Sequence, residues 1–209
     1  MIVIVDYGMG NLRSVAKALE SLGSPARVSS HPDDVAQAKK LIVPGVGAFP
    51  AAMRELHLKR LVDPLKASIK AGTPYLGICL GLQLLFERGE EGEGAEGLGI
   101  LAGTVKRLAA KPPLKIPHMG WNQLLSRKGA RAGAAAECPL LKGIPEGAFM
   151  YFVHSYVAEP TDQSLIAVES EYGERFAAMV WRQNLYATQF HPEKSQAVGL
   201  QLLKNFVAL

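Results

Sequence analysis

The first half of the chain alternates short β-rich runs with helical patterns, and this rhythm constrains the fold more than any other feature. Strand-like apolar runs lie at 2–5, 26–29 and 41–43, and another directly precedes residue 77. Apolar residues at helical spacing lie between them, at 12–22, 32–38 and 51–71. Apolar strands that alternate with helices predict a mostly parallel sheet covered on both faces. Right-handed crossovers then place the functional loops at the carboxyl ends of the strands.

Three residues mark where these helices should begin, break and end. Asn11 can cap the helix at 12–22, and Gly23 can end it. In the longer pattern at 51–71, Pro64 predicts a break, because proline removes a backbone donor and clashes with the preceding turn.

The second half of the chain is richer in β structure. After Arg88, the acidic and glycine-rich stretch GEEGEGAEG (89–97) is expected to be a solvated connection without a chemical role. Strands are expected at 105–108, 121–125, 148–153, 165–169, 176–181 and 185–190, with a hairpin turn at 171–174 and a closing helix at 193–207. The expected fold class is a three-layer α/β domain, with a mostly parallel central sheet and an added antiparallel β portion. Residues 1–209 should form this single domain.

Composition favours a soluble, cytoplasmic protein. Apolar residues make up 48% and charged residues 20% of the 209, as in ordinary globular chains, and no apolar run is long enough to cross a bilayer. Two cysteines, Cys79 and Cys138, are too few for the disulfide framework of a secreted protein. The net charge of +4 comes from scattered lysines and arginines, without a nucleic-acid-binding motif. We expect no nucleic acid and no membrane as partner; the charge fits docking on an acidic protein.

The stretch GICLGLQ (77–83) places Cys79 between Gly77 and Gly81, at the expected junction of a strand and a helix. A nucleophile at such a junction lies on a sharp turn that needs small neighbours and lifts the side chain above the edge of the sheet. The start of the following helix favours the thiolate, because unpaired N–H groups stabilise negative charge there. Free cysteine is also among the most buried residue types, so the stretch alone leaves a packing role open.

A thiol nucleophile needs a base, and His191 is the histidine best placed to provide one. It ends the apolar run LYATQF and is followed by Pro192 and Glu193. Residues two apart in an extended chain share a face, about 6 to 7 Å apart, so Glu193 can bond one imidazole nitrogen and leave the other for the thiol. Cys79, His191 and Glu193 are therefore predicted to form a catalytic triad.

Acyl chemistry also needs hydrogen-bond donors for the developing oxyanion. The N–H group of Leu80, directly after the nucleophile, is one candidate. The loop PGVG (44–47) supplies others in Val46 and Gly47, because its glycines let the backbone approach a ligand closely. A plain turn would also explain PGVG.

Cofactor and metal sites are not supported by the sequence. Gly8 and Gly10 could begin a dinucleotide-binding pattern, but Arg13 stands where its third glycine belongs. The histidines and cysteines lack the short spacing of metal ligands, and Cys138 stands alone before a proline. We expect no cofactor, no metal, and a packing or surface role for Cys138.

Six stretches together resemble the class I, triad-type glutamine amidotransferases: DYGMGN (6–11), PGVGAF (44–49), GICLGLQ (77–83), MGWN (119–122), YFVHSY (151–156) and QFHPEKS (189–195). GICLGLQ and QFHPEKS are similar to the whole class, although Leu82 and Lys194 replace the histidine and serine that other members typically have. DYGMGN, PHMGWN and FVHSY resemble one subfamily, whose members supply ammonia for imidazole glycerol phosphate formation in histidine biosynthesis. The resemblance covers residue 2 to the carboxyl terminus.

The resemblance implies an activity and a role for each matching residue. Cys79 would attack the side-chain amide of glutamine to give a glutamyl thioester and ammonia, with His191 as base and then acid, and Glu193 orienting His191. The glutamine pocket would be lined by Gly47, Gln83, His154, Ser155 and Tyr156. Residues of the subfamily-specific stretches would lie at a partner interface: Asn11, Trp121, Asn122 and Lys194.

The implied partner is a separate (β/α)8-barrel cyclase subunit, because 209 residues leave no room for a barrel in this chain. Ammonia would pass to that subunit within a heterodimer. A glutaminase that ran freely would waste glutamine, and a glycine-containing loop can hold its peptide planes in more than one orientation. We therefore hypothesise that PGVG is misaligned until the partner binds its own substrate.

Three alternatives remain at the level of the sequence. The first is another glutaminase of the same class, serving pyridoxal phosphate, anthranilate or purine synthesis; DYGMGN and PHMGWN argue against it. The second is a cysteine peptidase or stress protein on a related sheet, which would not release ammonia from glutamine. The third is a scaffold with a decayed site, against which the intact Cys79, His191 and Glu193 speak.

Overall fold

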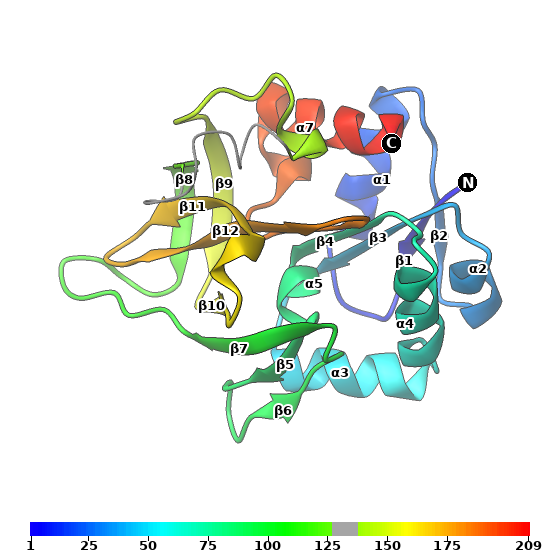
Figure 1. Ribbon diagram of the computed structural model, residues 1–209, viewed down its shortest axis with the longest axis horizontal. Coiled ribbons are helices and arrows are strands. Elements are labelled where there is room, and N and C mark those ends of the chain that lie inside the picture. Colours follow the sequence, from blue (N-terminus) through cyan, green and yellow to red (C-terminus); the bar gives the residue numbers. More distant parts are fainter. Residues whose placement is uncertain (127–137) are drawn as a thin grey trace.

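Five parallel strands form the centre of the molecule in the computed structural model (Figure 1). In spatial order they are β2 (Arg27–Ser29), β1 (Ile2–Val5), β3 (Lys40–Gly45), β4 (Tyr75–Cys79) and β13 (Leu185–Thr188). Beyond β13, the antiparallel strands β12 (Arg175–Arg182) and β11 (Ile166–Glu171) extend the sheet to seven strands. The structure describes residues 1–126 and 138–209. The prediction of a mostly parallel central sheet is confirmed.

Helices cover both faces of this sheet, as the apolar strands require. The helices are α1 (Leu12–Ser21), α2 (Pro32–Ala36), α3 (Phe49–Leu58), α4 (Val62–Lys70) and α7 (Gln196–Ala208). Ile2 and Ile4 of β1 share a buried cluster with residues of α1 and α7. Val3 and Val5, whose side chains point the opposite way, share a second cluster with α2, α3 and α4. This gives the three layers visible in Figure 1.

The added β portion consists of two smaller sheets. One has four strands, in the order β10 (Tyr156–Pro160), β7 (Leu101–Arg107), β5 (Phe86–Gly89) and β6 (Ala95–Glu96). The other pairs β8 (His118–Gln123) with β9 (Phe149–His154), antiparallel. The hairpin expected at 171–174 joins β11 to β12, with Gly173 at φ 77°. Two features differ from expectation: β10 was not predicted, and the 89–97 stretch is part of the β5–β6 hairpin.

Two predicted helix boundaries were wrong, and one predicted N-cap makes no side-chain hydrogen bond. The break in the 51–71 pattern comes at Arg60, whose φ is 54°, while Pro64 lies in the first turn of α4, where its missing N–H costs nothing. The closing helix begins at Gln196 because Pro192–Lys194 forms a separate 3₁₀ turn (η3). Asn11 occupies the N-cap position of α1, but its side chain makes no capping hydrogen bond.

The remaining helical segments are short. They are α5 (Leu80–Gln83) after β4 and the 3₁₀ turns η1 (Pro139–Leu141) and η2 (Gln163–Leu165). Within the described ranges, every helix is too short or too polar to span a membrane.

Candidate active site

The carboxyl ends of three adjacent strands bring the predicted site residues together. β4 ends at Cys79, which is paired in register with Gly45 at the end of β3. On the other side of β4, Thr188 at the end of β13 pairs with Ile78, and the chain runs on to His191. PGVG, the nucleophile and the base thus emerge at one edge of the sheet, as crossover geometry predicts.

Cys79 lies on a strained turn between β4 and α5. Its φ is 55° and ψ −105°, values that a non-glycine residue rarely adopts. The turn requires small neighbours: a Cβ on Gly77 would lie 2.5 Å from the Gly81 carbonyl oxygen, and one on Gly81 would collide with the Val43 carbonyl oxygen. The Tyr75 hydroxyl donates to the Gly81 carbonyl at 3.0 Å and secures the turn from below. Backbone strain at a reactive side chain is characteristic of nucleophile elbows.

His191 and Glu193 form a buried pair beside the thiol. Nδ1 of His191 donates to Oε1 of Glu193 at 2.9 Å, and both side chains are 1% exposed. Burial by itself would lower the pKa of His191, but the adjacent Cys79 and the Glu193 carboxylate outweigh it and raise this pKa to about 10. The imidazole is therefore well suited to hold a proton taken from the thiol.

The other imidazole nitrogen and the other carboxylate oxygen of this pair are not hydrogen-bonded to the described residues. His191 Nε2 and Glu193 Oε2 are buried and have no hydrogen-bond partner among the residues that the structure describes. The Cys79 sulfur instead lies 3.7 Å from the Val153 carbonyl oxygen and receives the Gln189 side-chain N–H at 3.6 Å. Because Nδ1 is engaged by the carboxylate, Nε2 is the nitrogen available to the thiol proton.

A cavity of 230 Å³ opens at Cys79. It is lined by Val46, Gly47, Cys79, Leu80, Gln83, Glu91, Val153, His154, Ser155 and Tyr156. All residues that were predicted for the oxyanion and for the glutamine pocket therefore line one cavity. Its size suits a small amino-acid substrate better than a long peptide.

Gln83 is held on the cavity wall by two hydrogen bonds from its side-chain N–H groups. They run to the Tyr156 carbonyl at 3.0 Å and to Gln189 Oε1 at 3.2 Å. Both amide hydrogens are thus used within the protein, and Oε1 of Gln83 is the atom left to meet a ligand.

The PGVG loop approaches the DYGMGN loop closely. Gly47 has φ 111°, and a Cβ there would lie 2.5 Å from the terminal methyl of Met9. A Cβ on Gly10, at φ 135°, would lie 3.0 Å from the Pro44 carbonyl oxygen. Both glycines have positive φ values that other residues rarely adopt, so a side chain at either position would strain the contact between the two loops.

Glu91 lines the cavity and was missed in the sequence. It lies in the hairpin expected to have no chemical role, and its Oε2 accepts the N–H of Phe49 at the start of α3 at 2.7 Å. It is the only carboxylate among the residues that line this cavity. Its acidic, glycine-rich surroundings resemble a solvated loop, so composition gave no signal; only the pairing of β5 and β6 places it here.

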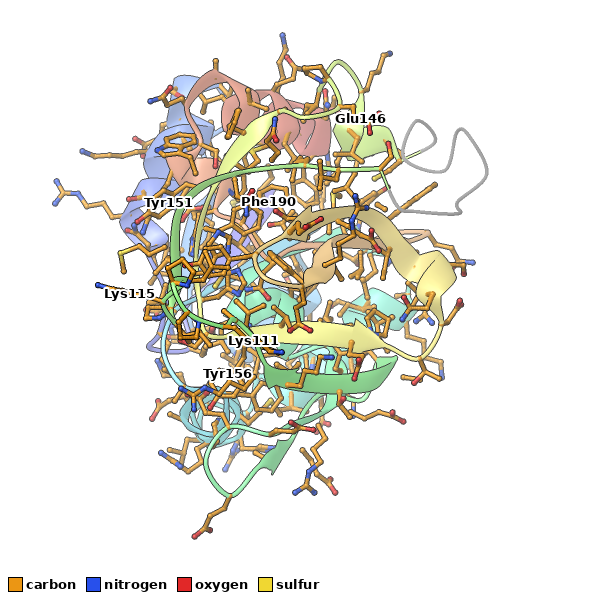
Figure 2. The ribbon with its side chains drawn as sticks, turned by 90° about the vertical axis from the view of Figure 1, so that its left-hand side faces the viewer. Lys111, Lys115, Glu146, Tyr151, Tyr156 and Phe190 are labelled. Carbon is orange, nitrogen blue, oxygen red and sulfur yellow. The ribbon has the colours of Figure 1, made fainter. Side chains whose placement is uncertain are left out.

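The residues predicted for a partner interface differ in how far their side chains are exposed. Trp121 is 46% exposed and contacts Tyr151 edge-on at 6.0 Å, and Lys194 Nζ lies 5.8 Å from the Tyr151 ring. Tyr151 belongs to the face viewed in Figure 2. Asn122, on the opposite side of β8 from Trp121, points inward and hydrogen-bonds within the protein. Asn11 is partly exposed at the start of α1.

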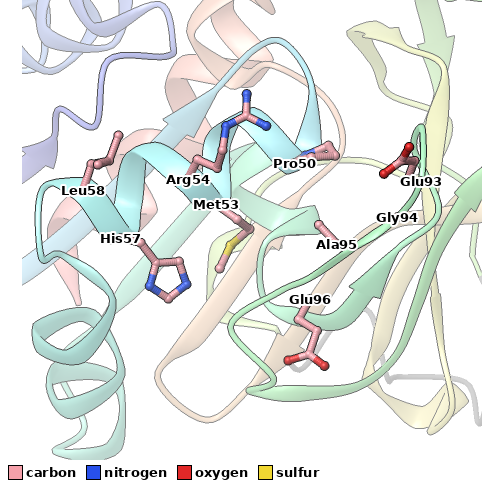
Figure 3. A pocket seen from close by; sticks show the side chains of 9 residues that line it. All are labelled: Pro50, Met53, Arg54, His57, Leu58, Glu93, Gly94, Ala95 and Glu96. Carbon is pink, nitrogen blue, oxygen red and sulfur yellow. The ribbon is translucent and has the colours of Figure 1, made fainter.

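A second cavity of 890 Å³ lies between α3 and the β5–β6 hairpin (Figure 3). Met53, Arg54 and His57 of α3 line one side of it, and Glu93 and Glu96 of the hairpin line the other. It contains none of the triad residues, so its larger volume does not make it the catalytic centre. Cys138, the other thiol, is 1% exposed, and burial raises its pKa to about 11, which makes it a packing residue. In the described part of the chain, no cluster of His, Cys, Asp and Glu could hold a metal ion.

Comparison with known proteins gives consistent similarities. Residues 3–209 match the sequence model of glutamine amidotransferase class-I. Imidazole glycerol phosphate synthase subunit HisH of Syntrophotalea carbinolica is 50% identical over 99% of this chain and 98% of its own. The protein of the same name from Thermosynechococcus vestitus is 51% identical over 100% and 96%, and that from Aquifex aeolicus 50% over 98% and 94%.

Solved structures show the same fold at low sequence identity. A crystal structure of a glutamine amidotransferase has a TM-score of 0.73 at 20% identity, covering 100% of this chain and 98% of its own. PurLQS from Thermotoga maritima has a TM-score of 0.72 at 15% identity, covering 99% and 97%. At such identities these neighbours bear on architecture only.

Proposed function

The chain belongs to the class I glutamine amidotransferases, and we propose that it is the glutaminase subunit of an imidazole glycerol phosphate synthase. The observation that carries the activity is the thiol of Cys79 on a strained elbow, beside a histidine that a buried carboxylate orients. The full-length similarity to HisH proteins supports the choice of synthase among the ammonia-supplying subunits of the class.

The reaction begins with transfer of the Cys79 proton to His191 Nε2. The thiolate attacks the side-chain amide carbon of glutamine, and the carbonyl oxygen becomes an oxyanion. His191 then returns the proton to the amide nitrogen, the C–N bond breaks, and ammonia leaves a glutamyl thioester. Water activated by His191 hydrolyses the thioester to glutamate. Glu193 keeps His191 in the Nδ1–H tautomer throughout.

The oxyanion is stabilised by backbone donors from two segments, Leu80 after the nucleophile and Val46 with Gly47 in PGVG. All three residues line the cavity at Cys79, which supports this assignment. Donors in a fixed, partly dehydrated site stabilise developing charge far better than water does.

Glutamine itself is held by Gly47, Gln83, His154, Ser155 and Tyr156. Glu91 adds the one carboxylate of the cavity lining, and the α-ammonium group of glutamine is the part of the substrate that a carboxylate would pair with. The Glu91 side chain is already fixed by the Phe49 N–H, so little side-chain entropy is lost on binding.

Residues 1–209 form one amidotransferase domain, located in the cytoplasm, and the ammonia passes to a separate (β/α)8-barrel cyclase in a heterodimer. Asn11, Trp121, Asn122 and Lys194 mark the contact with that subunit. The exposed Trp121 supports this, because aromatic residues are enriched at protein interfaces. PGVG is aligned only when the cyclase has bound its nucleotide substrate.

The test is ammonia release from glutamine by the chain with its cyclase subunit. We expect glutamate and ammonia to appear, fastest when the cyclase nucleotide is bound. Cys79→Ala should abolish glutamine-dependent cyclisation, while added ammonium salt still supports it; the matched control Cys138→Ala should keep both. If Cys79→Ala lost cyclisation with glutamine and also with ammonium salt, the proposed division of labour would be contradicted. Equal rates of glutamine hydrolysis by the free chain, the complex and the nucleotide-bound complex would refute the proposal that nucleotide binding aligns PGVG.

A further inference from the structure

A continuous chain of hydrogen bonds runs from β8 to the wall of the catalytic cavity. The Asn122 side-chain nitrogen lies 3.3 Å from His118 Nε2. His118 Nδ1 lies 3.0 Å from His154 Nε2. His154 Nδ1 lies 3.1 Å from the carbonyl oxygen of Tyr156. His118 has no part in the mechanism above, yet it connects Asn122 to a residue of the glutamine pocket.

The backbone fixes the direction of the first bond. Oδ1 of Asn122 accepts the N–H of Gln123 at 2.8 Å, and its Nδ2 donates to the Glu171 carbonyl at 2.9 Å. A backbone N–H can only donate and a carbonyl can only accept, so the amide cannot be turned round without losing both bonds. Asn122 therefore presents an N–H group to His118 Nε2, which must be the unprotonated nitrogen of that ring.

The tautomers of both histidines follow from the two ends of this series of hydrogen bonds, the Asn122 amide and the Tyr156 carbonyl. Since His118 Nε2 accepts, a proton of a neutral His118 sits on Nδ1 and points at His154 Nε2. At the far end, the Tyr156 carbonyl can only accept, so His154 carries its proton on Nδ1. The two arguments meet without conflict: His154 Nε2 is the acceptor for His118 Nδ1–H. A positive charge on either ring would turn one acceptor in the chain into a second donor.

The surroundings favour the neutral rings that this pattern requires. His118 lies between the rings of Phe152 and Tyr172, with ring centroids at 5.0 and 4.1 Å. Both histidines are buried, at 2% and 6% exposed. Burial lowers the pKa of His118 to about 4 and that of His154 to about 3, the latter helped by its histidine neighbours.

This chain of hydrogen bonds ends at groups that line the proposed glutamine pocket. The Tyr156 carbonyl accepts from His154 and also from the Gln83 side chain at 3.0 Å. Gln83 in turn donates to Gln189, whose own N–H points at the Cys79 sulfur at 3.6 Å. A change in the protonation of the two imidazoles would therefore alter the position of Gln83 more directly than that of the Cys79 thiol.

We propose that His118 is a positioning residue of the glutaminase site: with Asn122, it holds His154 in the Nδ1–H tautomer and thereby fixes the Tyr156 carbonyl and the Gln83 side chain that receive glutamine. The kinetic part of this inference rests on the proposed function. Since Asn122 and the exposed Trp121 are neighbours on β8, the same chain connects the proposed partner face to the substrate pocket.

The first test reads the tautomers directly. Long-range ¹H–¹⁵N spectra of the histidine-labelled protein separate the Nδ1–H, Nε2–H and charged forms, with the five histidines assigned by single substitutions. We expect His118 and His154 both neutral and protonated on Nδ1 at pH 7. An Nε2–H or charged form of either ring would overturn the proposal, whatever the catalytic activity.

The second test uses the complex with the cyclase subunit and its nucleotide. His118→Phe keeps the ring packing but removes the donor to His154, so the KM for glutamine should rise about tenfold, as for the loss of one buried hydrogen bond, with kcat changed by less than about twofold. His118→Asn restores a donor close to the place of Nδ1 and should return KM to within about twofold of the parent. His57→Asn, on the exposed face of α3, is the matched control and should change neither constant.

Three results separate the possible failures. A parent KM in His118→Phe, or equal impairment in His118→Phe and His118→Asn, would overturn the positioning role. If His118→Phe does not fold, Asn122→Ala takes its place, with saturating cyclase: it should convert His118 to a tautomer mixture and raise KM, and an unchanged tautomer would overturn the proposal. An unsubstituted complex that releases no ammonia from glutamine would refute the proposed function and leave the tautomer result standing.

Discussion

At the scale of single residues, the site depends on which atom of each polar group is already used. Nδ1 of His191 is bonded to Glu193, which leaves Nε2 for the thiol. Both N–H groups of Gln83 are bonded within the protein, which leaves its oxygen for the substrate. Local hydrogen bonds thus decide the direction in which each catalytic group can act.

Glu193→Gln should show how far the carboxylate controls His191. Gln can still accept from Nδ1–H, but it lacks the negative charge that, together with the larger effect of Cys79, raises the pKa of His191 against the effect of burial. The pKa of His191 should therefore fall. Because protonated His191 delivers the proton to the leaving ammonia in the proposed mechanism, the alkaline limb of the kcat–pH profile should move to lower pH.

The rate should also fall, by about 10² to 10⁴, the range for losing the orienting carboxylate of a triad or a positioned proton donor. Steady-state ammonia release by the complex between pH 6 and 10 (roughly the range between a free histidine and the raised pKa) provides the measurement. An alkaline limb that stays in place would mean that Glu193 does not control the titration of His191.

The proximity of the proposed triad residues could be predicted from the sequence because it is local, although the η3 turn and not the expected extended segment joins His191 to Glu193. His191 and Glu193 are two residues apart, and Cys79 lies between glycines that only a sharp turn requires. Glu91 and His118 could not be predicted in the same way. The carboxylate reaches the cavity only because β5 pairs with β6, and the imidazole reaches His154 only because β8 pairs with β9.

At the scale of elements, the sequence predicted the strands better than the helix boundaries. Strand positions follow from runs of buried apolar residues, and most were predicted; the exceptions are β10 and the β5–β6 hairpin. The helix break near Arg60 depends on a left-handed residue that has no glycine or asparagine signature, whereas Pro64 is the obvious breaker and lies harmlessly in a first turn. The predicted start of α7 was wrong because residues 192–194 form the separate η3 turn. The Ser195 hydroxyl stabilises this turn by donating to the His191 carbonyl at 2.6 Å.

The β5–β6 hairpin offers a matched pair of substitutions. Glu91 is the only carboxylate among the described residues that line the cavity at Cys79, and Glu91→Gln removes it yet keeps an oxygen for the Phe49 N–H. Glu93→Gln, two residues on, changes the same charge in the second cavity. In Glu91→Gln the KM for glutamine should rise about tenfold or more, the value of a charge-assisted hydrogen bond, with a smaller effect on kcat.

Steady-state kinetics of the complex, with glutamine varied, would measure both constants. Glu93→Gln should behave as the parent. Equal effects of the two substitutions would show that the hairpin acts through its overall charge, and a kcat effect alone would place Glu91 in the chemistry and not in binding.

At the scale of the whole molecule, two exposed apolar side chains, Met119 and Trp121, lie on the same side of β8. We refer to Met119, Trp121, Tyr151 and Lys194 together as the docking face. Met119 is 63% and Trp121 46% exposed, and Tyr151 connects Trp121 to Lys194. Lys194 directly follows Glu193, so a partner on this face would lie within three residues of the proposed catalytic carboxylate and base. The face and the catalytic centre are thus parts of one structural unit.

Trp121→Ala should therefore weaken the complex. A large aromatic side chain that is half exposed in the free chain gains most by being covered, and truncating such an anchor commonly costs about 2 kcal/mol or more, some thirtyfold in Kd. Calorimetric titration of the chain with the cyclase subunit gives the Kd. Leu58→Ala is the matched control, because Leu58 is 75% exposed but lies on α3 beside the second cavity. At saturating cyclase, glutamine hydrolysis by Trp121→Ala should recover, since its triad is intact; an unchanged Kd, or an equal loss in Leu58→Ala, would place the partner on another surface.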